Sequence, residues 1–280
     1  MEDQTKLLAG LICSDAELVE YYVQLITEIK RFVLKAIWCP DTERSIDIAA
    51  DNDVPSVSHT AFQLISRNDT NTIVIVGHAA HNALFCMQAQ ALKKKAICIG
   101  TAALSEYTAQ LLVEFSERHH TFLRIIYPLK YSTPIALIKA NITKIGSIQN
   151  INAEATFEQP QDAKHRLYNE CNTVLHQELQ YLHMQIAFGN AVASIRIAVN
   201  TTKTLILRIT GELGFFLLDP RMLILEGCGG QGVLWRGDGT MESIFRSGIV
   251  KGLENCDCDK ISTDTNELNL VQCVSKCRFI

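Results

Sequence analysis

The stretch Thr72–Gly100 (TIVIVGHAAHNALFCMQAQALKKKAICIG) decides the fold class of this chain. It opens with Thr72–Val76, a short apolar run of strand length. A helical segment is predicted over Ala80–Leu92, and Ala96–Ile99 is a second short apolar run. A strand, a helix and a strand in this order predict two parallel strands joined by a right-handed crossover.

The same alternation extends to both sides of this unit. Further strands are predicted at Lys6–Cys13, Phe32–Trp38 and Thr121–Ile126, and further helices at Asp15–Lys30, Glu43–Asp51, Thr60–Ser66 and Ser105–Arg118. Short apolar strands separated by amphipathic helices indicate a parallel sheet covered on both faces. The sequence therefore predicts an α/β, Rossmann-like, doubly wound domain over residues 1–126.

The pattern changes after Pro134. A helix is predicted at Ile135–Asn141, and alternating residues then predict a strand at Ile148–Phe157. Later strands are expected at Tyr181–Phe188, Ala191–Val199, Thr204–Ile209, Gly214–Leu218, Met222–Leu225 and Val233–Trp235, with a tight turn at Gly189-Asn190. Residues 127–253 are thus predicted to form an α+β domain with a mainly antiparallel sheet, and residues 254–280 a polar, cysteine-containing tail with little order.

Composition narrows the class of protein. The net charge is -4, with 26 basic and 30 acidic residues, which provides no basic surface for nucleic acid or anionic lipid. No apolar stretch reaches the roughly 20 residues that span a bilayer, and Met1–Lys6 lacks the order of a signal peptide. A cytoplasmic protein with reduced thiols is expected. The basic run Lys93–Lys95 is interpreted as a solvated helix end.

Several segments are similar to the motifs of one known protein family. They are Val54-Pro55 before the strand at Ile73–Val76, Leu92–Cys98 (LKKKAIC), and Leu129–Gly146 (LKYSTPIALIKANITKIG) followed by the strand up to Phe157. With strands and helices in this order, Gly10–Phe157 resembles the glucose-fructose oxidoreductase, inositol dehydrogenase and MocA (Gfo/Idh/MocA) family of NAD(P)-dependent enzymes. Ala36-Ile37-Trp38 and Ala96-Ile97-Cys98 are most similar to the glucose-fructose oxidoreductase domain-containing proteins of animals.

The resemblance implies a pyrophosphate-binding turn after the first strand, and this turn departs from the family pattern. Cys13, Asp15 and Leu18 stand where the family has glycines, which allow backbone amides to approach the phosphates. The carboxylates of Asp15 and Glu17 would repel phosphate. Ser14 and Asp15 are interpreted as N-cap residues of the following helix.

Two more family positions are altered. After the second strand, where the family holds the ribose, the chain has Cys39-Pro40-Asp41-Thr42-Glu43-Arg44. Asp41 or Arg44 could substitute there from a shifted position, although Asp41 is more simply a helix cap. The family's Glu-Lys-Pro motif, whose lysine takes part in proton transfer, corresponds to Ile99-Gly100-Thr101. The catalytic lysine that the resemblance implies is therefore absent.

The family's sugar-handling helix, with its Asp and His, has no counterpart in residues 158–180, which look shortened. His176 or His183 could act as the acid or base in its place, although a histidine on a partly apolar element is more simply a packed core residue. Cys256, Cys258, Cys273 and Cys277 could gather four thiolates around zinc. His78, His81, His119 and His120 are predicted near strand ends that face the expected cleft, where they could hold a metal. The spacing favours neither, so no catalytic residue and no metal ligand is assigned. The glycine-rich stretch 227–239 is interpreted as hairpin turns.

The sequence thus favours a pseudo-oxidoreductase that acts as a binding or scaffold protein without a cofactor. The alternatives are a divergent NAD(P)-dependent oxidoreductase of a sugar or polyol, in which amides at Ser14–Ala16 still hold the cofactor, and a sensor that binds a nucleotide without turnover. The positions of the altered cofactor site are Cys13, Ser14, Asp15, Ala16, Cys39, Asp41, Val76, Gly77 and His78. An unidentified protein partner is expected, with a homodimer through the strands of residues 181–225.

Overall fold

The computed structural model describes residues 6–158, 181–188, 191–200, 204–227 and 229–256. These residues form two compact units. The chain passes from the first unit to the second after Tyr127 and returns to the first at Gly252.

The first unit is a five-stranded sheet with its helices. Its elements are β1 (Leu7–Cys13), α1 (Val19–Glu28), β2 (Phe32–Trp38), α2 (Thr42–Asp51), α3 (Ala61–Ile65), β3 (Thr72–Val76), α4 (Ala79–Ala91), β4 (Lys95–Ile99), α5 (Glu106–His119) and β5 (Leu123–Ile126). All strand pairs are parallel, in the order β2-β1-β3-β4-β5. The predicted doubly wound sheet is confirmed.

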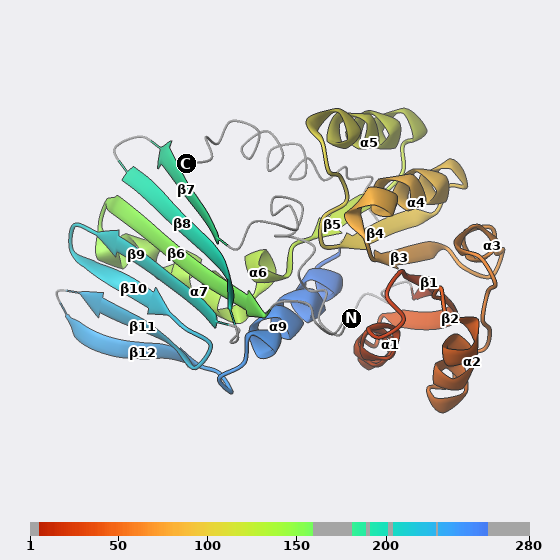
Figure 1. The fold of residues 1–280 in the computed structure, drawn as a ribbon, viewed down its shortest axis with the longest axis horizontal. Coiled ribbons are helices and arrows are strands. Elements are labelled where there is room, and N and C mark those ends of the chain that lie inside the picture. Colours follow the sequence, from red (N-terminus) through yellow and green to blue (C-terminus); the bar gives the residue numbers. More distant parts are fainter. Residues whose placement is uncertain (1–5, 159–180, 189–190, 201–203, 228, 257–280) are drawn as a thin grey trace. The chain divides into compact units, whose positions relative to one another are not determined.

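Burial explains the apolar character of these strands. Every residue of β3 is buried, and β1 and β4 are buried over most of their length. Figure 1 shows α4 and α5 on one side of this sheet and α1 and α2 on the other. Because both faces are covered, the central strands are continuous hydrophobic runs rather than alternating ones.

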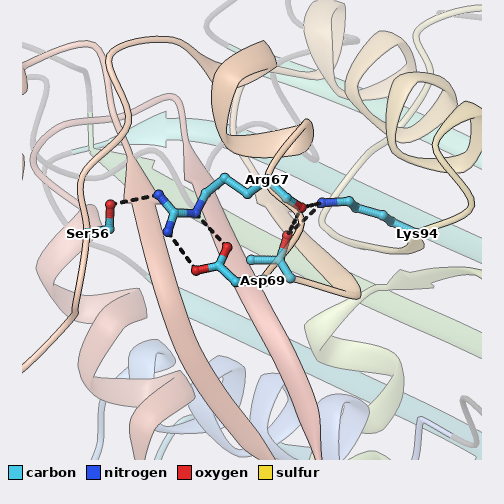
Figure 2. A network of polar contacts seen from close by, with 5 residues as sticks. Ser56, Arg67, Asp69 and Lys94 are labelled. Atoms are coloured by element: carbon cyan, nitrogen blue, oxygen red, sulfur yellow. Dashed lines mark hydrogen bonds and ion pairs between the residues drawn. The ribbon is translucent and has the colours of Figure 1, made fainter.

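A polar network ties together the loops before β3 and β4 (Figure 2). The Arg67 guanidinium forms two hydrogen bonds with the Asp69 carboxylate, at 2.8 and 2.7 Å, and donates a third to Ser56 Oγ at 2.7 Å. The Lys94 ammonium donates to the Arg67 carbonyl and, at 2.7 Å, to Thr70 Oγ1. Burial lowers the pKa of Lys94. This network fixes the amino-terminal edge of the sheet.

The prediction that Lys93–Lys95 is a solvated helix end is wrong for Lys94, which is only 8% exposed. Lys93 adopts a positive φ of 59°. Its ammonium donates to the carbonyl of His119, the last residue of α5, at 2.8 Å. The run therefore holds neighbouring segments together, and Lys93 meets a helix C-terminus that favours a cation.

The second unit is built on a seven-stranded sheet. Its elements are α6 (Pro128–Tyr131), α7 (Thr133–Asn141), the 3-10 helix η1 (Ile142–Ile145), β6 (Ile148–Glu158), β7 (Tyr181–Phe188), β8 (Ala191–Asn200), β9 (Thr204–Gly211), β10 (Gly214–Leu218), β11 (Met222–Gly227), β12 (Gly230–Arg236) and α9 (Met241–Glu254). The order is β12-β11-β10-β9-β6-β8-β7, and β6–β8 is a parallel pair in an otherwise antiparallel sheet. The mainly antiparallel sheet is confirmed.

One face of this sheet packs on α7 and η1. The core consists of Ile138, Ile145, Ile209, Phe216, Leu218 and Leu223. Helix α9, whose last residues belong to the first unit, was not predicted. The turn at Gly189-Asn190 and the tail beyond Cys256 lie outside the described residues. Within the described part of the chain, no helix is long and apolar enough to span a membrane.

Candidate functional site

The candidate site is the carboxyl edge of the parallel sheet. Strand β1 pairs with β2 on one side and with β3 on the other, so successive crossovers leave β1 in opposite directions. Ligands in open α/β sheets bind at such a switch point, outside the carboxyl ends of the strands. All nine positions of the predicted cofactor site lie here, at the ends of β1, β2 and β3.

The turn between β1 and α1 uses its own backbone groups. The Ser14 amide donates to the Val76 carbonyl at 2.9 Å, which extends the β1–β3 ladder by one bond. The Glu17 amide donates to Asp15 Oδ1 at 3.1 Å, and the Leu18 amide donates to the Asp15 carbonyl at 3.2 Å. Three amides that could face a phosphate thus already have acceptors within the protein.

The predicted N-caps of α1 are wrong. The helix begins at Val19, its N-cap position is Leu18, and no side chain accepts a hydrogen bond there. Asp15 instead closes a turn that precedes the helix, because a short carboxylate can accept from the amide two residues further on. The helix start therefore lies further from β1 than the sequence predicted.

Ser14 occupies the space next to Gly77. A Cβ added to Gly77 would lie 2.6 Å from Ser14 Cβ and closer still to its Oγ. Real Cβ atoms do not approach so closely, so only glycine fits opposite this side chain. The loops after β1 and β3 are thus in direct contact at the switch point.

Cys13 is buried, and its thiol forms a hydrogen bond within the turn that follows β1. Its side chain is 0% exposed, and Sγ donates to the Asp15 carbonyl at 3.1 Å. Burial raises the pKa of this thiol to about 12. A neutral, buried thiol stands where the resemblance implies the first glycine of a phosphate-binding turn.

The end of β2 also carries a buried cysteine whose thiol lies close to the carbonyl two residues further on. Cys39 is 1% exposed, and its Sγ lies 2.9 Å from both the Asp41 carbonyl and Ser45 Oγ. Asp41 caps α2, since its Oδ1 accepts from the Arg44 amide at 3.0 Å. The interpretation of Asp41 as a helix cap is confirmed.

Asn82, which sequence reasoning missed, joins the loops after β3 and β4. It is 0% exposed, and its Nδ2 donates to the Gly77 carbonyl at 3.1 Å and to the Thr101 carbonyl at 2.8 Å. His78 caps α4, accepting from the Ala80 amide at 3.3 Å. An asparagine in the first turn of a helix that follows a strand is the sequence signal that could have identified this residue.

The end of β4 carries no group for proton transfer. Ile99 is 4% exposed, and Gly100 has a φ of 94°, a conformation that favours glycine. The Gly100 amide donates to the Ile126 carbonyl at 2.9 Å. Lys93–Lys95 lie at the opposite end of β4.

The four histidines considered for a metal do not gather. His78 and His81 have ring centroids 6.2 Å apart at the carboxyl edge. His119 and His120 end α5 and precede β5, so they lie at the amino-terminal edge, contrary to the prediction. Among the described residues, no three His, Cys, Asp or Glu side chains are placed to share a metal ion.

Some predicted positions fall outside this description. His176 and the cysteines at 258, 273 and 277 lie beyond the described residues. His183 lies in β7, for which only the backbone is described. Cys256 is 0% exposed, and its Sγ donates to the Gly252 carbonyl at 3.2 Å.

Neither a family model nor a curated protein matches this sequence. Solved structures do match it over nearly its whole length. A putative oxidoreductase from Magnetospirillum magnetotacticum has a TM-score of 0.75 at 16% identity, with 98% of this chain and 100% of that chain covered. A Gfo/Idh/MocA family oxidoreductase from Vibrio cholerae has a TM-score of 0.74 at 13% identity, covering 96% and 98%.

A third similar structure is a biliverdin reductase from Synechocystis, in complex with biliverdin and NADP+. Its TM-score is 0.73 at 12% identity, and 96% of each chain is covered. At such low identities the likeness is one of fold. The chain therefore has the fold of the Gfo/Idh/MocA oxidoreductases: a parallel, Rossmann-like unit followed by a unit with a mainly antiparallel sheet.

Proposed function

We propose that this chain is a divergent Gfo/Idh/MocA protein, nearest to the glucose-fructose oxidoreductase domain-containing group, that binds a partner without transferring hydride. The observation that carries the proposal is the closed switch point. Ser14 bonds to Val76 through its amide and packs on Gly77 through its side chain. A dinucleotide's pyrophosphate needs free amides and glycine-lined space at this place.

Electrostatics points the same way. Asp15 and Glu17 bring two carboxylates to the turn, and one buried oxygen of Glu17 has no hydrogen-bond partner among the described residues. A phosphate brought to this turn would meet negative charge in a partly buried setting, where screening by water is weak. The turn is unsuited to an anion.

At the end of β4, Ile99 and Gly100 also provide no side chain for proton transfer. Hydride transfer to or from a carbonyl carbon is assisted by a group that moves the hydroxyl proton. Ile99 and Gly100 have no side chain able to do so. A bound nucleotide would lack this assistance.

The alternative is an NAD(P)-dependent oxidoreductase that acts on a sugar or polyol. Three structures of the same fold carry the cofactor: the Synechocystis reductase with NADP+, an Agrobacterium radiobacter oxidoreductase with NAD+, and GenD2 of gentamicin A biosynthesis with NAD. In the present chain, Ala16 is the place where an amide could still meet a phosphate, since no acceptor for it lies among the described residues.

For the partner, we propose a second copy of this chain, which meets the open face of the seven-stranded sheet. Val192, Ile206 and Val233 are 43%, 41% and 45% exposed. Strand register places all three on the face opposite the Ile209 and Phe216 core. Exposed apolar side chains on one face favour association. Light scattering on Ile206→Glu tests this, because a dimer through this face should dissociate.

Titration with NADH and with NADPH tests the main proposal, with nicotinamide fluorescence and melting temperature as readouts. A ligand that binds only the folded state raises the melting temperature, and we expect no response at millimolar cofactor. Two variants add the same negative charge at different places. Ala16→Glu places it in the turn and is the test variant, and Gln24→Glu places it on the exposed side of α1 and is the control. Saturable binding that Ala16→Glu abolishes and Gln24→Glu preserves would overturn the proposal and support the alternative.

A further inference from the structure

Two buried cysteines lie at the carboxyl ends of adjacent parallel strands: Cys13 is the last residue of β1, and Cys39 directly follows β2. In the β1–β2 register Leu11 pairs with Ile37 and Ile12 with Trp38, so the next step places Cys13 beside Cys39. Neighbouring strands lie about 4.8 Å apart, and in-register residues of parallel strands project to the same face. Disulfides need Cα separations of roughly 4.4–6.8 Å. The backbone therefore already suits a bridge.

The two thiols have matching surroundings. Each donates to the carbonyl two residues further on, Cys13 to Asp15 and Cys39 to Asp41. Each is turned toward its own loop, and both cysteines are free. Rotation about the two Cα–Cβ bonds would bring the sulfur atoms toward each other, without a change in strand pairing.

We propose that Cys13 and Cys39 form a reversible disulfide that links the ends of β1 and β2. Hydrogen peroxide is the oxidant: the sulfur of one thiol attacks it, the O–O bond breaks, and a sulfenic acid forms while the leaving hydroxide takes the thiol proton and becomes water. The second thiol attacks the sulfenic sulfur, which forms the S–S bond and releases a second water. The two thiols lose two electrons and two protons, and a dithiol reverses the reaction by thiol–disulfide exchange.

Local opening controls this reaction. Both thiols are buried, and the raised pKa of Cys13, about 12, disfavours its reactive thiolate in the closed structure. The turn of residues 14–18 is held by a few backbone bonds, and α1 begins without a side-chain cap. Segments of this kind open at lower free-energy cost than a core strand, so oxidation of the folded protein should proceed, but slowly.

The bridge would change the candidate site. Closing it removes the thiol hydrogen bonds to the Asp15 and Asp41 carbonyls and the contact between Cys39 and Ser45 Oγ. The first turns after β1 and β2 then rearrange together. The shape of the carboxyl edge of the sheet would then depend on the redox state of Cys13 and Cys39. This holds whether or not a nucleotide binds there, so the inference does not rest on the proposed function.

Tryptic mapping of peroxide-treated folded protein tests the inference. Cleavage after Lys6 and Lys30 isolates Cys13 on one peptide, and cleavage after Lys35 and Arg44 isolates Cys39 on another. After free thiols are alkylated without reductant, we expect these peptides as one linked species, lighter than their sum by two hydrogens. Dithiothreitol should restore both separate peptides.

The variants are Cys39→Ser, which should abolish the linked species, and Cys86→Ala, a buried cysteine of α4 that should leave it unchanged. The mapping of the wild-type protein stands even if a variant fails to fold. Absence of the linked species while other cysteines oxidise would overturn the inference. So would its formation only in urea-unfolded protein, because the native register would then have no part in it.

Discussion

Ser14 and Gly77 close the switch point of the parallel sheet against each other, with Ser14 Cβ 2.6 Å from the place that a Cβ on residue 77 would take. The Ser14 amide adds a hydrogen bond to the Val76 carbonyl just before that glycine. A serine and a glycine on different loops thus pack against each other at the carboxyl edge of the sheet.

Gly77→Ala should destabilise the protein by about 1–3 kcal/mol, because the new methyl group overlaps the Ser14 side chain. Adding Ser14→Gly should recover part of that loss, and a double-mutant cycle from chemical denaturation measures the coupling. Gly229→Ala is the control, since a Cβ there meets no atom within 4 Å. Purely additive effects of the two changes would contradict the contact.

Asn82→Ala should cost about 1–3 kcal/mol, because the carbonyls of Gly77 and Thr101 lose their shared donor. Asn82→Asp should cost at least as much, since an ionised carboxylate keeps the shape but cannot donate. Denaturant unfolding measures both variants. If the aspartate variant were as stable as the wild type, the bridge between the two loops would have no energetic role.

Lys94→Met should lower the free energy of unfolding by about 1–3 kcal/mol. The Arg67 carbonyl and Thr70 hydroxyl would lose the ammonium that satisfies them in a buried setting (Figure 2). Lys93→Met is the matched control. Its single bond to the exposed end of α5 predicts a change below about 1 kcal/mol. Equal effects at the two positions would refute the distinction between them.

The Arg67–Asp69 pair should make stability depend on pH. Hydrogen bonding to Arg67 lowers the pKa of the Asp69 carboxyl in the folded state. The pair therefore contributes fully to the free energy of unfolding above the ordinary carboxyl pKa of Asp69 in the unfolded chain. This contribution is lost as the pH falls through the lowered pKa of Asp69 in the folded protein. The Asp69 side chain is 50% exposed, which limits the effect to about 1 kcal/mol.

Unfolding of the wild type and Asp69→Asn across acidic pH measures this contribution. The difference between them should shrink as the pH falls. Asp47→Asn, an exposed change on α2, corrects for the general loss of a carboxylate. A difference that grew toward low pH would reverse the expected sign.

Parts of the fold that depend on local pattern could be predicted from the sequence. β2 and β3 have the predicted bounds, Phe32–Trp38 and Thr72–Val76. In β3 every residue is buried, and burial on both faces leaves a continuous apolar run between polar turns. Asp41 was identified as a cap because capping involves only neighbours in the chain. That the side chains of Ile99 and Gly100 cannot move a proton likewise follows from residue type alone.

Helix α9 shows why other parts could not be predicted. Two glycines, Gly248 and Gly252, lower its helix propensity, yet both lie within it. A Cβ on Gly248 would overlap the Pro128 carbonyl, and one on Gly252 would lie 2.6 Å from Ile126 Cγ2. Close packing, which the local pattern does not reveal, requires glycine at both positions and stabilises the helix.

The sequence by itself determined the alternation of strands and helices and the residue types at the carboxyl edge, because both depend on short-range spacing. Tertiary structure decided that Ser14 fills the space beside Gly77, that Asn82 bridges two loops and that Lys94 is buried. Each of these facts includes a contact between residues that are 19 or more positions apart in the chain. Such contacts exist only once parallel strands bring distant loops to a common edge.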